Sequence, residues 1–394
     1  MRVIVGSYAV RYPLGGNVSH VLQYLIGLAE LGHDVFLVEK AGYQDSCYDP
    51  VLNVMTSDCS RGVATVSVEL ERVALGGRLC YVDESNNYHG ISRRMIEETF
   101  ATADAYIEMG SHEAWEQESA HVPLRVAVDG DPGFSQIWMA DRRASGESVP
   151  SYDAYFTVGS RLADGTSKAP DGGVRWEHTF HPVATAFFSG SVPASEGSAY
   201  TTVMNWKSYK TVEYQGEEYG HKSVEFEKFL GLPSMTRATM EAAIAGHGVP
   251  YERLESNGWR LASAHQVTRS VDAFVRYIVG SRGEFTVCKN GFVALETGWF
   301  GDRSSAYLAC GRPVVVQDTG FGSVLPCGQG IFAVADVNEA AAAIDEIEGD
   351  YAAHSTAARE IAAEYLEARN VMRRMLDRAT RVASSGDVEP TRAD

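Results

Sequence analysis

The chain has 394 residues, a length that holds two or three domains at about 150 residues each. Hydrophobic residues make up 45% and charged residues 22%, an ordinary globular composition that excludes a mostly disordered or fibrous chain. Its 34 basic and 52 acidic residues give a formal charge of −18. Because a net acidic surface repels phosphate backbones, this charge argues against extended binding to nucleic acid or to anionic membrane.

The N-terminal segment predicts a βαβ unit. A short β-branched run at Val3–Val5 is typical of a buried parallel strand. After a Gly/Pro-rich loop, apolar residues recur at helical spacing from Val18 to Ala29. Gly32 provides the expected left-handed end of that helix, and residues 35–38 form the next strand.

The rest of the chain continues to alternate. The pattern is loose over residues 42–90, and strands are then expected at 105–109, 124–128 and 154–158. The turn-rich stretch 189–198 is the best candidate for a linker. Beyond it we expect a strand at 201–204, helices at 223–230, 236–246 and 270–279, a strand at 285–287, a short helix from 302 and a strand after 312. Residues 340–381 are Ala-, Glu- and Arg-rich with helical apolar spacing.

This organisation predicts an α/β protein with two Rossmann-like domains. We expect an N-terminal domain over 1–190, a second domain over 199–350, and helices over 351–385. No apolar run approaches the roughly 18 residues of a membrane span, and the N-terminus lacks the features of a secretory signal. The six cysteines are scattered, with no CxxC or Cys/His cluster. We therefore expect a cytoplasmic protein with reduced thiols and no zinc site.

Polar side chains follow two strands of the first half. His112 comes after the strand at 105–109, and Asp129 and Asp131 come after the strand at 124–128. In open α/β sheets such strand ends face the ligand crevice. His112 is a candidate general base or sugar-binding group, and a turn histidine is the alternative. The two aspartates are candidates for acceptor or sugar binding, but Asp–Gly–Asp–Pro–Gly is also ordinary turn chemistry, and we expect no metal there.

Candidate phosphate-binding residues occur in both halves. Gly15 and Gly16 stand where a backbone can approach a ligand, or where a βα turn needs residues without Cβ. In the second half, a helix opening at Asp302 would present free amides, and charged or hydroxyl side chains follow at Arg303, Ser304 and Ser305. The chain has only seven lysines. Two of them, Lys222 before a helix and Lys289 after a strand, are placed to neutralise a diphosphate; a solvated lysine is the alternative.

Two motifs resemble GT-B glycosyltransferases, in particular their large retaining family of bacterial nucleotide-sugar-dependent enzymes. The first is Pro13-Leu14-Gly15-Gly16, with its helix and the Leu-Gly-His-Asp-Val of residues 31–35. The second is Ala-Cys-Gly-Arg-Pro-Val-Val at 309–315, followed by Asp318-Thr319-Gly320 and by Leu-Pro-Cys-Gly-Gln-Gly at 325–330. The resemblance covers nearly the whole chain, with a vague middle.

The resemblance implies two domains facing across a cleft, with the C-terminal helices crossing back to the first. The second domain would hold a nucleotide-diphosphate sugar through Lys222, Ser304 and Ser305, within a donor block that includes Thr319 and Gly320. The loop at Gly15 and Gly16 would approach the donor, and His112 would lie at the sugar. The family needs no divalent metal and no cofactor other than the donor co-substrate.

One departure from the family concerns its pair of glutamates before the small-Gly-x-Pro segment. Those positions are Gly298 and Ala306 here, so the ribose and sugar contacts must come from elsewhere, with Asp302 and Glu296 as candidates.

We therefore predict a metal-independent glycosyltransferase, with retention favoured over inversion, that acts on a small-molecule or lipid-linked acceptor. For inversion, His112, Asp129 and Asp131 are the candidate bases. A non-hydrolysing nucleotide-sugar epimerase on the same fold and a non-catalytic nucleotide-sugar-binding protein are the alternatives. The sequence leaves the donor base, the acceptor and the oligomeric state open, a homodimer included.

Overall fold

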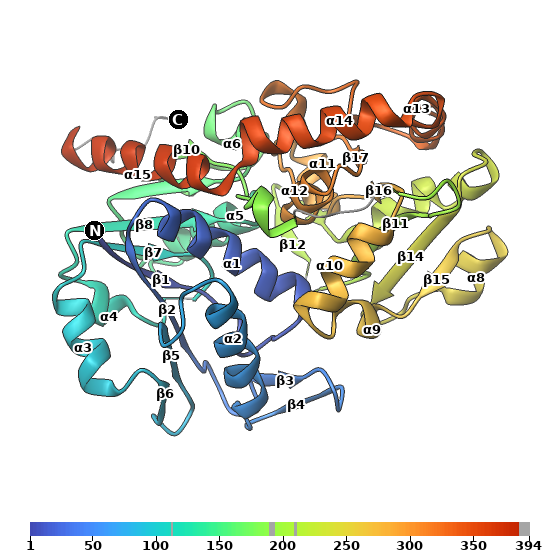
Figure 1. The fold of residues 1–394 in the computed structure, drawn as a ribbon. Helices are drawn as coiled ribbons and strands as arrows, with labels where there is room; N and C mark the ends of the chain where they lie inside the picture. Colours follow the sequence, from blue (N-terminus) through green and yellow to red (C-terminus); the bar gives the residue numbers. More distant parts are fainter. Residues whose placement is uncertain (112, 189–193, 209–210, 386–394) are drawn as a thin grey trace.

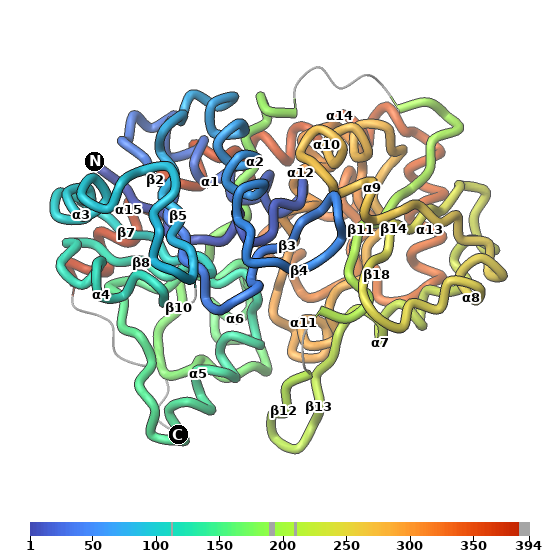
Figure 2. Tube along the Cα trace, turned by 90° about the horizontal axis from the view of Figure 1, so that it is seen from below, coloured from blue at the N-terminus to red at the C-terminus, as the bar shows by residue number. Residues whose placement is uncertain are grey.

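The strands of the protein form two large sheets, of eight and six strands. The computed structural model describes residues 1–111, 113–188, 194–208 and 211–385. Helices cover each sheet, and the two resulting lobes lie side by side (Figures 1 and 2). We call the lobe built on the eight-stranded sheet the first lobe, and the lobe built on the six-stranded sheet the second lobe.

The first sheet has the strand order β10-β9-β8-β7-β1-β2-β5-β6. Its strands are β1 (Arg2–Gly6), β2 (Asp34–Lys40), β5 (Leu79–Val82), β6 (Tyr88–Gly90), β7 (Ala105–Glu108), β8 (Leu124–Asp129), β9 (Ala154–Thr157) and β10 (Trp176–His178). All neighbours pair in parallel except the edge strand β6, which is antiparallel to β5. The predicted βαβ unit is confirmed, since Val3 pairs with Val35 and α1 (Gly15–Glu30) connects the two strands.

The other elements of the first lobe surround this sheet. They are α2 (Ser60–Arg72), α3 (Arg93–Ala101), α4 (Glu116–Ser119), α5 (Phe134–Ala144), α6 (Ser160–Ala163), the 3₁₀ turn η1 (Thr185–Phe188), and a hairpin of β3 (Cys47–Asp49) and β4 (Val54–Thr56). Figure 2 shows this hairpin between the two lobes. Its Pro50 carbonyl is in contact with His265 Nε2 of the second lobe.

The second sheet is parallel throughout, in the order β15-β14-β11-β16-β17-β18. Its strands are β11 (Tyr200–Asn205), β14 (Met240–Ala245), β15 (Arg260–Ala262), β16 (Gly283–Thr286), β17 (Val314–Gln317) and β18 (Ile331–Val334). A hairpin of β12 (Val212–Tyr214) and β13 (Glu217–Tyr219) precedes α7 (Lys222–Phe226). The remaining elements are η2 (Glu227–Phe229), η3 (Leu232–Ser234), α8 (Tyr251–Ser256), α9 (Ala264–Thr268), α10 (Val271–Gly280), α11 (Asn290–Ala294), α12 (Asp302–Ala309), η4 (Phe321–Ser323) and α13 (Val337–Gly349).

The helix predicted over 236–246 is wrong, because these residues contain β14. Met-Glu-Ala-Ala-Ile-Ala consists largely of strong helix formers, which explains the prediction. In the fold the segment pairs with strands on both sides, and Ala242 and Ala243 are fully buried. Small side chains suit a central strand covered on both faces, so the position in the sheet overrides the local helix propensity.

The C-terminal helices return to the first lobe, as Figure 1 shows for α15 (Ala368–Ser385). They follow α14 (Tyr351–Ile361) and a π-helical turn at Ala362–Leu366. Val183 of the first lobe donates to Leu366 O at 2.8 Å and accepts from Ala368 N at 3.0 Å. Met372 and Met375 of α15 are buried in the core of the first lobe.

The predicted architecture of two Rossmann-like lobes with a returning C-terminal helix is thus confirmed. The divisions at 190, 199 and 350 stay a proposal, because residues 189–193 lie outside the described ranges. Among the residues that the structure describes, no helix combines the length and the apolar character needed to cross a membrane.

Candidate nucleotide-sugar site

The two lobes meet where their parallel strands end. Asp131 follows β8 of the first sheet, and Lys289 follows β16 of the second. Lys289 Nζ lies 2.5 Å from Asp131 Oδ1, so an ion pair joins the two strand ends. Carboxyl ends of parallel strands are the usual ligand-binding edge of open α/β sheets, which makes this junction the candidate site.

Two further cations lie at the carboxyl end of β16. Arg303, in the first turn of α12, donates from Nε to Glu284 Oε1 at 2.8 Å and from Nη2 to Thr286 Oγ1 at 3.0 Å. Lys222, the first residue of α7, has its Nζ 3.4 Å from the same Thr286 hydroxyl. We call Lys222, Lys289 and Arg303 the cation cluster; it gathers three of the predicted donor-binding residues from three separate segments.

Burial and mutual repulsion disfavour the positive charge of the cation cluster when no anion is bound. Lys222 is only 9% exposed, and burial together with the charge of Arg303 lowers the pKa of its ammonium group to about 7. The charge of Lys289 acts in the same direction. An anion bound here would favour the protonated lysine, so the site is chemically suited to a phosphate or diphosphate.

Lys289 also lies over aromatic rings from both lobes. Its Nζ is 5.3 Å from the ring centre of Phe134, in the first lobe, and 5.2 Å from that of Phe292. A cation at this distance from an aromatic face is attracted by the ring. Together with Asp131, these contacts hold the ammonium group at the junction.

The Asp129 carboxylate is hydrogen-bonded by its own loop and by residues of α5 and β9. Its carboxylate accepts hydrogen bonds from Ser135 Oγ at 2.6 Å, Thr157 Oγ1 at 2.8 Å, Gln136 Nε2 at 2.9 Å and the Asp131 amide at 2.9 Å. Burial raises the pKa of the Asp129 carboxyl, and these hydrogen bonds oppose that shift. The geometry therefore favours a positioning role for Asp129, which orders the loop that carries Asp131.

The predicted phosphate-binding helix, α12, starts at the interface between the lobes. Ser304 Oγ donates to Glu284 Oε2 at 2.5 Å, and Ser305 Oγ lies 3.3 Å from Gly301 O. Both serine side chains are buried, and in this structure their hydroxyls donate hydrogen bonds to acceptors of the protein interior. At the same helix start the side chains of Asp302 and Arg303 are 39% and 17% exposed.

Two histidines of the first lobe lie against the start of α12. His20 Nδ1 is 3.8 Å from Asp302 Oδ2, and the ring of His181 is 4.9 Å from that of His20. Burial lowers the pKa of both rings, that of His181 to about 3, so both are neutral near pH 7. The cavity between these elements has a volume of about 10 Å³ and is lined by Gly16, His20, Asp302 and Arg303, among others. It has room for about one water molecule and not for a sugar.

The glycine pair of the first loop lies at a close contact between the lobes. A Cβ on Gly15 would stand 2.1 Å from Ser270 O, next to α10 of the second lobe. A Cβ on Gly16 would stand 3.3 Å from the Phe274 ring. The packing of α1 against α10 thus explains Gly15 without a ligand, and donor contact by either glycine stays a prediction.

Thr319 and Gly320 lie where the second lobe contacts α6. Thr319 Oγ1 donates to Trp299 O at 2.7 Å. Gly320 has φ +96°, and a Cβ there would stand 2.2 Å from Arg161 Cδ. Beside them, the Arg161 amide donates to Thr297 O at 3.2 Å, so this region links the two lobes through backbone hydrogen bonds. Donor contact by Thr319 and Gly320 also stays a prediction.

Asp302 is better placed than Glu296 to make the donor contact for which the family uses a glutamate. Glu296 is bound by two cations, Arg161 Nη1 at 2.7 Å and Lys168 Nζ at 2.5 Å. Asp302 keeps a side chain that is 39% exposed and shares the small cavity with Ala306, one of the two substituted positions. His112 lies outside the described residues, so its predicted role is not addressed by the geometry.

Four residues that shape the site are not predicted from the sequence: His20, His181, Glu284 and Thr286. One of them left a signal, since Glu284 is a carboxylate in the short strand Gly-Glu-Phe-Thr, whose four residues are all buried. A buried carboxylate needs a cationic partner, and the nearby motif offered Arg303. The histidines gave no comparable signal, because their positions on α1 and after β10 become neighbours only in the folded lobe.

Comparison with solved structures shows the same fold in glycosyltransferases. AviGT4, a glycosyltransferase involved in avilamycin A biosynthesis, is 14% identical over 98% of both chains, with a TM-score of 0.58. HepE of Anabaena, solved in complex with UDP-glucose, is 11% identical over 97% of this chain and all of its own, also with a TM-score of 0.58. Sucrose-phosphate synthase of Thermosynechococcus elongatus is 12% identical over 98% of this chain, with a TM-score of 0.51.

These likenesses show that the chain has the GT-B fold over nearly its whole length. No protein-family model and no curated protein sequence matches it.

Proposed function

We propose that this protein is a glycosyltransferase that moves a sugar from a nucleotide-diphosphate donor to a small-molecule or lipid-linked acceptor. The observation that carries the proposal is the cation cluster at the junction of two GT-B lobes. Lys222 and Arg303 meet at the Thr286 hydroxyl, and Lys289 reaches Asp131 of the opposite lobe. In this proposal the donor diphosphate lies on the cation cluster and the amino end of α12.

The chemistry of sugar transfer suits this arrangement. As the bond between the sugar and the diphosphate breaks, negative charge builds up on the leaving group. Fixed cations and helix-terminal amides stabilise that charge in a site with little water. The cation cluster supplies this stabilisation from the chain's own residues, and we therefore propose transfer without a divalent cation.

The first lobe would hold the acceptor. Asp131 presents a carboxylate at the junction with a side chain that is 35% exposed, and Asp129 fixes its loop. In the retaining reaction that we favour, the acceptor hydroxyl attacks from the face that the diphosphate leaves, so no protein nucleophile is needed. Asp131, and His112 as predicted from the sequence, are the groups proposed to contact the acceptor or the transferred sugar.

UDP-glucose is the first donor to test, because HepE, which shares the fold, was solved in complex with it. The full-length protein would be mixed with UDP-glucose and an acceptor panel, with Mg²⁺ and Mn²⁺ omitted, and UDP release would be measured. GDP-, ADP- and dTDP-sugars would follow. We expect release that depends on the acceptor and is lost in Lys222→Ala, but not in Lys168→Ala, which removes a lysine that is 63% exposed.

Two other results would overturn the proposal. Conversion of the donor sugar without any acceptor would identify an epimerase on the same fold. Nucleotide-sugar binding with no turnover across the panel would identify a non-catalytic binding protein.

A further inference from the structure

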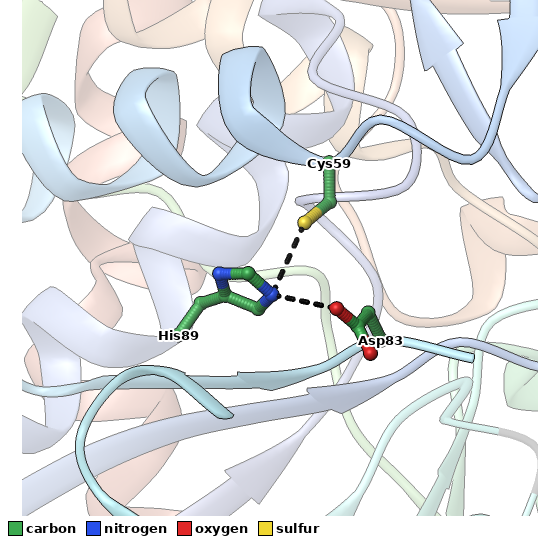
Figure 3. Close-up of side chains that lie close together, drawn as sticks. All are labelled: Cys59, Asp83 and His89. Carbon is green, nitrogen blue, oxygen red and sulfur yellow. Dashed lines mark hydrogen bonds and ion pairs between the residues drawn. The ribbon is translucent and has the colours of Figure 1, made fainter. Parts of the chain in front are cut away.

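Three side chains with metal-ligating atoms converge at the edge of the first sheet (Figure 3). His89 Nε2 lies 3.5 Å from Cys59 Sγ and 2.9 Å from Asp83 Oδ2. The three ligand atoms all lie within 4.8 Å of one another. Among the residues that the structure describes, this is the one group of three or more such side chains close enough to share an ion.

The arrangement is not that of a catalytic relay. In a Cys–His–Asp relay the two ring nitrogens have different partners, the thiol on one and the carboxylate on the other. Here a single nitrogen, Nε2, faces both the sulfur and the carboxylate. One nitrogen offers either one proton or one lone pair, so it cannot fully satisfy both neighbours, whereas an ion placed between the three atoms can.

We propose that Cys59, Asp83 and His89 bind one Zn²⁺ ion, with water as the fourth ligand. Thiolate, imidazole and carboxylate are the three protein ligand types of zinc. Tetrahedral bonds of about 2.0–2.3 Å place neighbouring ligand atoms roughly 3.3–3.5 Å apart. The S···N separation of 3.5 Å already has this value, the N···O separation of 2.9 Å needs to widen by a few tenths of an ångström, and the S···O separation is no more than 4.8 Å. Zinc replaces the thiol proton, which is released to solvent on binding.

The surroundings hold the ligands in place. Asp83 Oδ1 accepts from the amides of Ser85 and Asn87, each at 2.9 Å, and Oδ2 accepts from Asn87 Nδ2 at 3.0 Å. His89 is fixed on β6, where it pairs with Tyr81 of β5. Such outer contacts orient metal ligands and are part of working metal sites.

The site would join the connection between the β3–β4 hairpin and α2 to the edge of the first sheet. Cys59 directly precedes α2 and follows the β3–β4 hairpin, whose Pro50 contacts His265 of the second lobe. Asp83 and His89 belong to the sheet edge formed by β5 and β6. Zinc would therefore fix the hairpin that contacts the second lobe. Four strands, β5, β2, β1 and β7, separate β6 from the strand that ends in Asp129, so the inference does not depend on the proposed transferase site.

The test measures metal binding directly on the full-length protein. The chain is stripped with a chelator and titrated with Co²⁺, whose bonds to thiolate give a charge-transfer absorption, and Zn²⁺ affinity is then measured by displacement of the cobalt. We expect one equivalent of Co²⁺ with the thiolate absorption in the wild-type protein. Cys59→Ser should abolish this absorption, and His89→Gln should weaken Zn²⁺ binding by about 100-fold or more.

Cys327→Ser is the matched control, because Cys327 is an exposed thiol outside the cluster and its loss should leave the absorption unchanged. Circular dichroism would show whether Cys59→Ser folds. His89→Gln keeps the test valid if Cys59→Ser does not fold, because the His89 side chain is 33% exposed on an edge strand and its substitution should be tolerated. A wild-type protein without the thiolate absorption, or a His89→Gln protein with undiminished Zn²⁺ affinity, would overturn the proposal and identify a hydrogen-bonded cluster only.

Discussion

The two strand ends that meet at the lobe junction have opposite chemistry. Three cations from separate segments, Lys222, Lys289 and Arg303, gather at the end of β16 in the second lobe, whereas the end of β8 in the first lobe carries Asp129 and Asp131. The cations on the second lobe are largely buried and fixed by neighbours, as a group with constant geometry such as a diphosphate requires. Asp131 is more exposed, as the proposed contact with a variable acceptor requires. The contrast teaches that donor binding and acceptor binding can be tested separately, one lobe at a time.

The largest effect should come from Arg303→Met. This change leaves the fully buried Glu284 without its cation, and an unpaired buried charge costs about 3–5 kcal/mol of stability. Urea unfolding would measure that loss, and UDP binding should also disappear. The double variant Arg303→Met/Glu284→Gln should recover most of the stability without recovering UDP binding. Recovery of both together would reduce Arg303 to a structural partner of Glu284.

Lys222→Ala should weaken UDP binding by about 10- to 150-fold, the equivalent of about 1.5–3 kcal/mol for a hydrogen bond to a charged group. Isothermal titration would measure it, with Lys168→Ala as the control. Stability should not fall with it, because burial and the charge of Arg303 already disfavour the ammonium group of Lys222. If UDP bound Lys222→Ala as tightly as wild type, the diphosphate would have to lie elsewhere than on the cation cluster.

These two residues show how much of the site was predictable. Lys222 and Arg303 were predicted from local motifs, a lysine before a helix and a polar helix start, and the structure brings them together. Glu284 and Thr286, which hold them, were missed because a strand pattern does not show which side chain will face a neighbouring helix. Gly15 was noticed for its conformational freedom, but its closest neighbour, Ser270, lies on the other lobe and far along the chain.

In the fold, too, the elements set by local sequence were predicted, and those set by distant neighbours were not. Strand β1, helix α1 and strand β2 follow from β-branched runs and helical spacing, which are local properties of the chain. The segment of β14 is rich in Ala and Glu, so it was predicted as a helix. Its strand conformation is decided by its position between β11 and β15, which local sequence does not show. Cys59 and His89 are 30 residues apart, so no spacing motif announces their contact.

The pH dependence of UDP binding should sharpen the assignment of Lys222. In the free protein its ammonium group loses its proton as the pH rises through about 7, whereas a bound diphosphate holds the proton in place. Binding then takes up a proton, and affinity should fall by up to about tenfold per pH unit above pH 7. Titrations from pH 7 to 9, where a terminal phosphate with a pKa of about 6 stays ionised, would show this slope. Lys222→Arg should bind UDP with little pH dependence; an equal slope in that variant would assign the proton to another group.

The smallest effect on the donor should come from the opposite strand end. Asp131→Asn removes the charge that pairs with Lys289 across the junction but leaves the cation cluster intact. UDP affinity should therefore change by less than about threefold, while acceptor-dependent turnover should fall by about tenfold, since general acid–base or acceptor-orienting groups contribute at least that much. Glu97→Gln, on an exposed helix of the same lobe, is the control. A double-mutant cycle with Lys289→Ala separates the two roles of Asp131. If the carboxylate acted only by holding Lys289, Asp131→Asn would add no further loss to the Lys289→Ala variant, whereas independent contact with the acceptor would make the two losses additive.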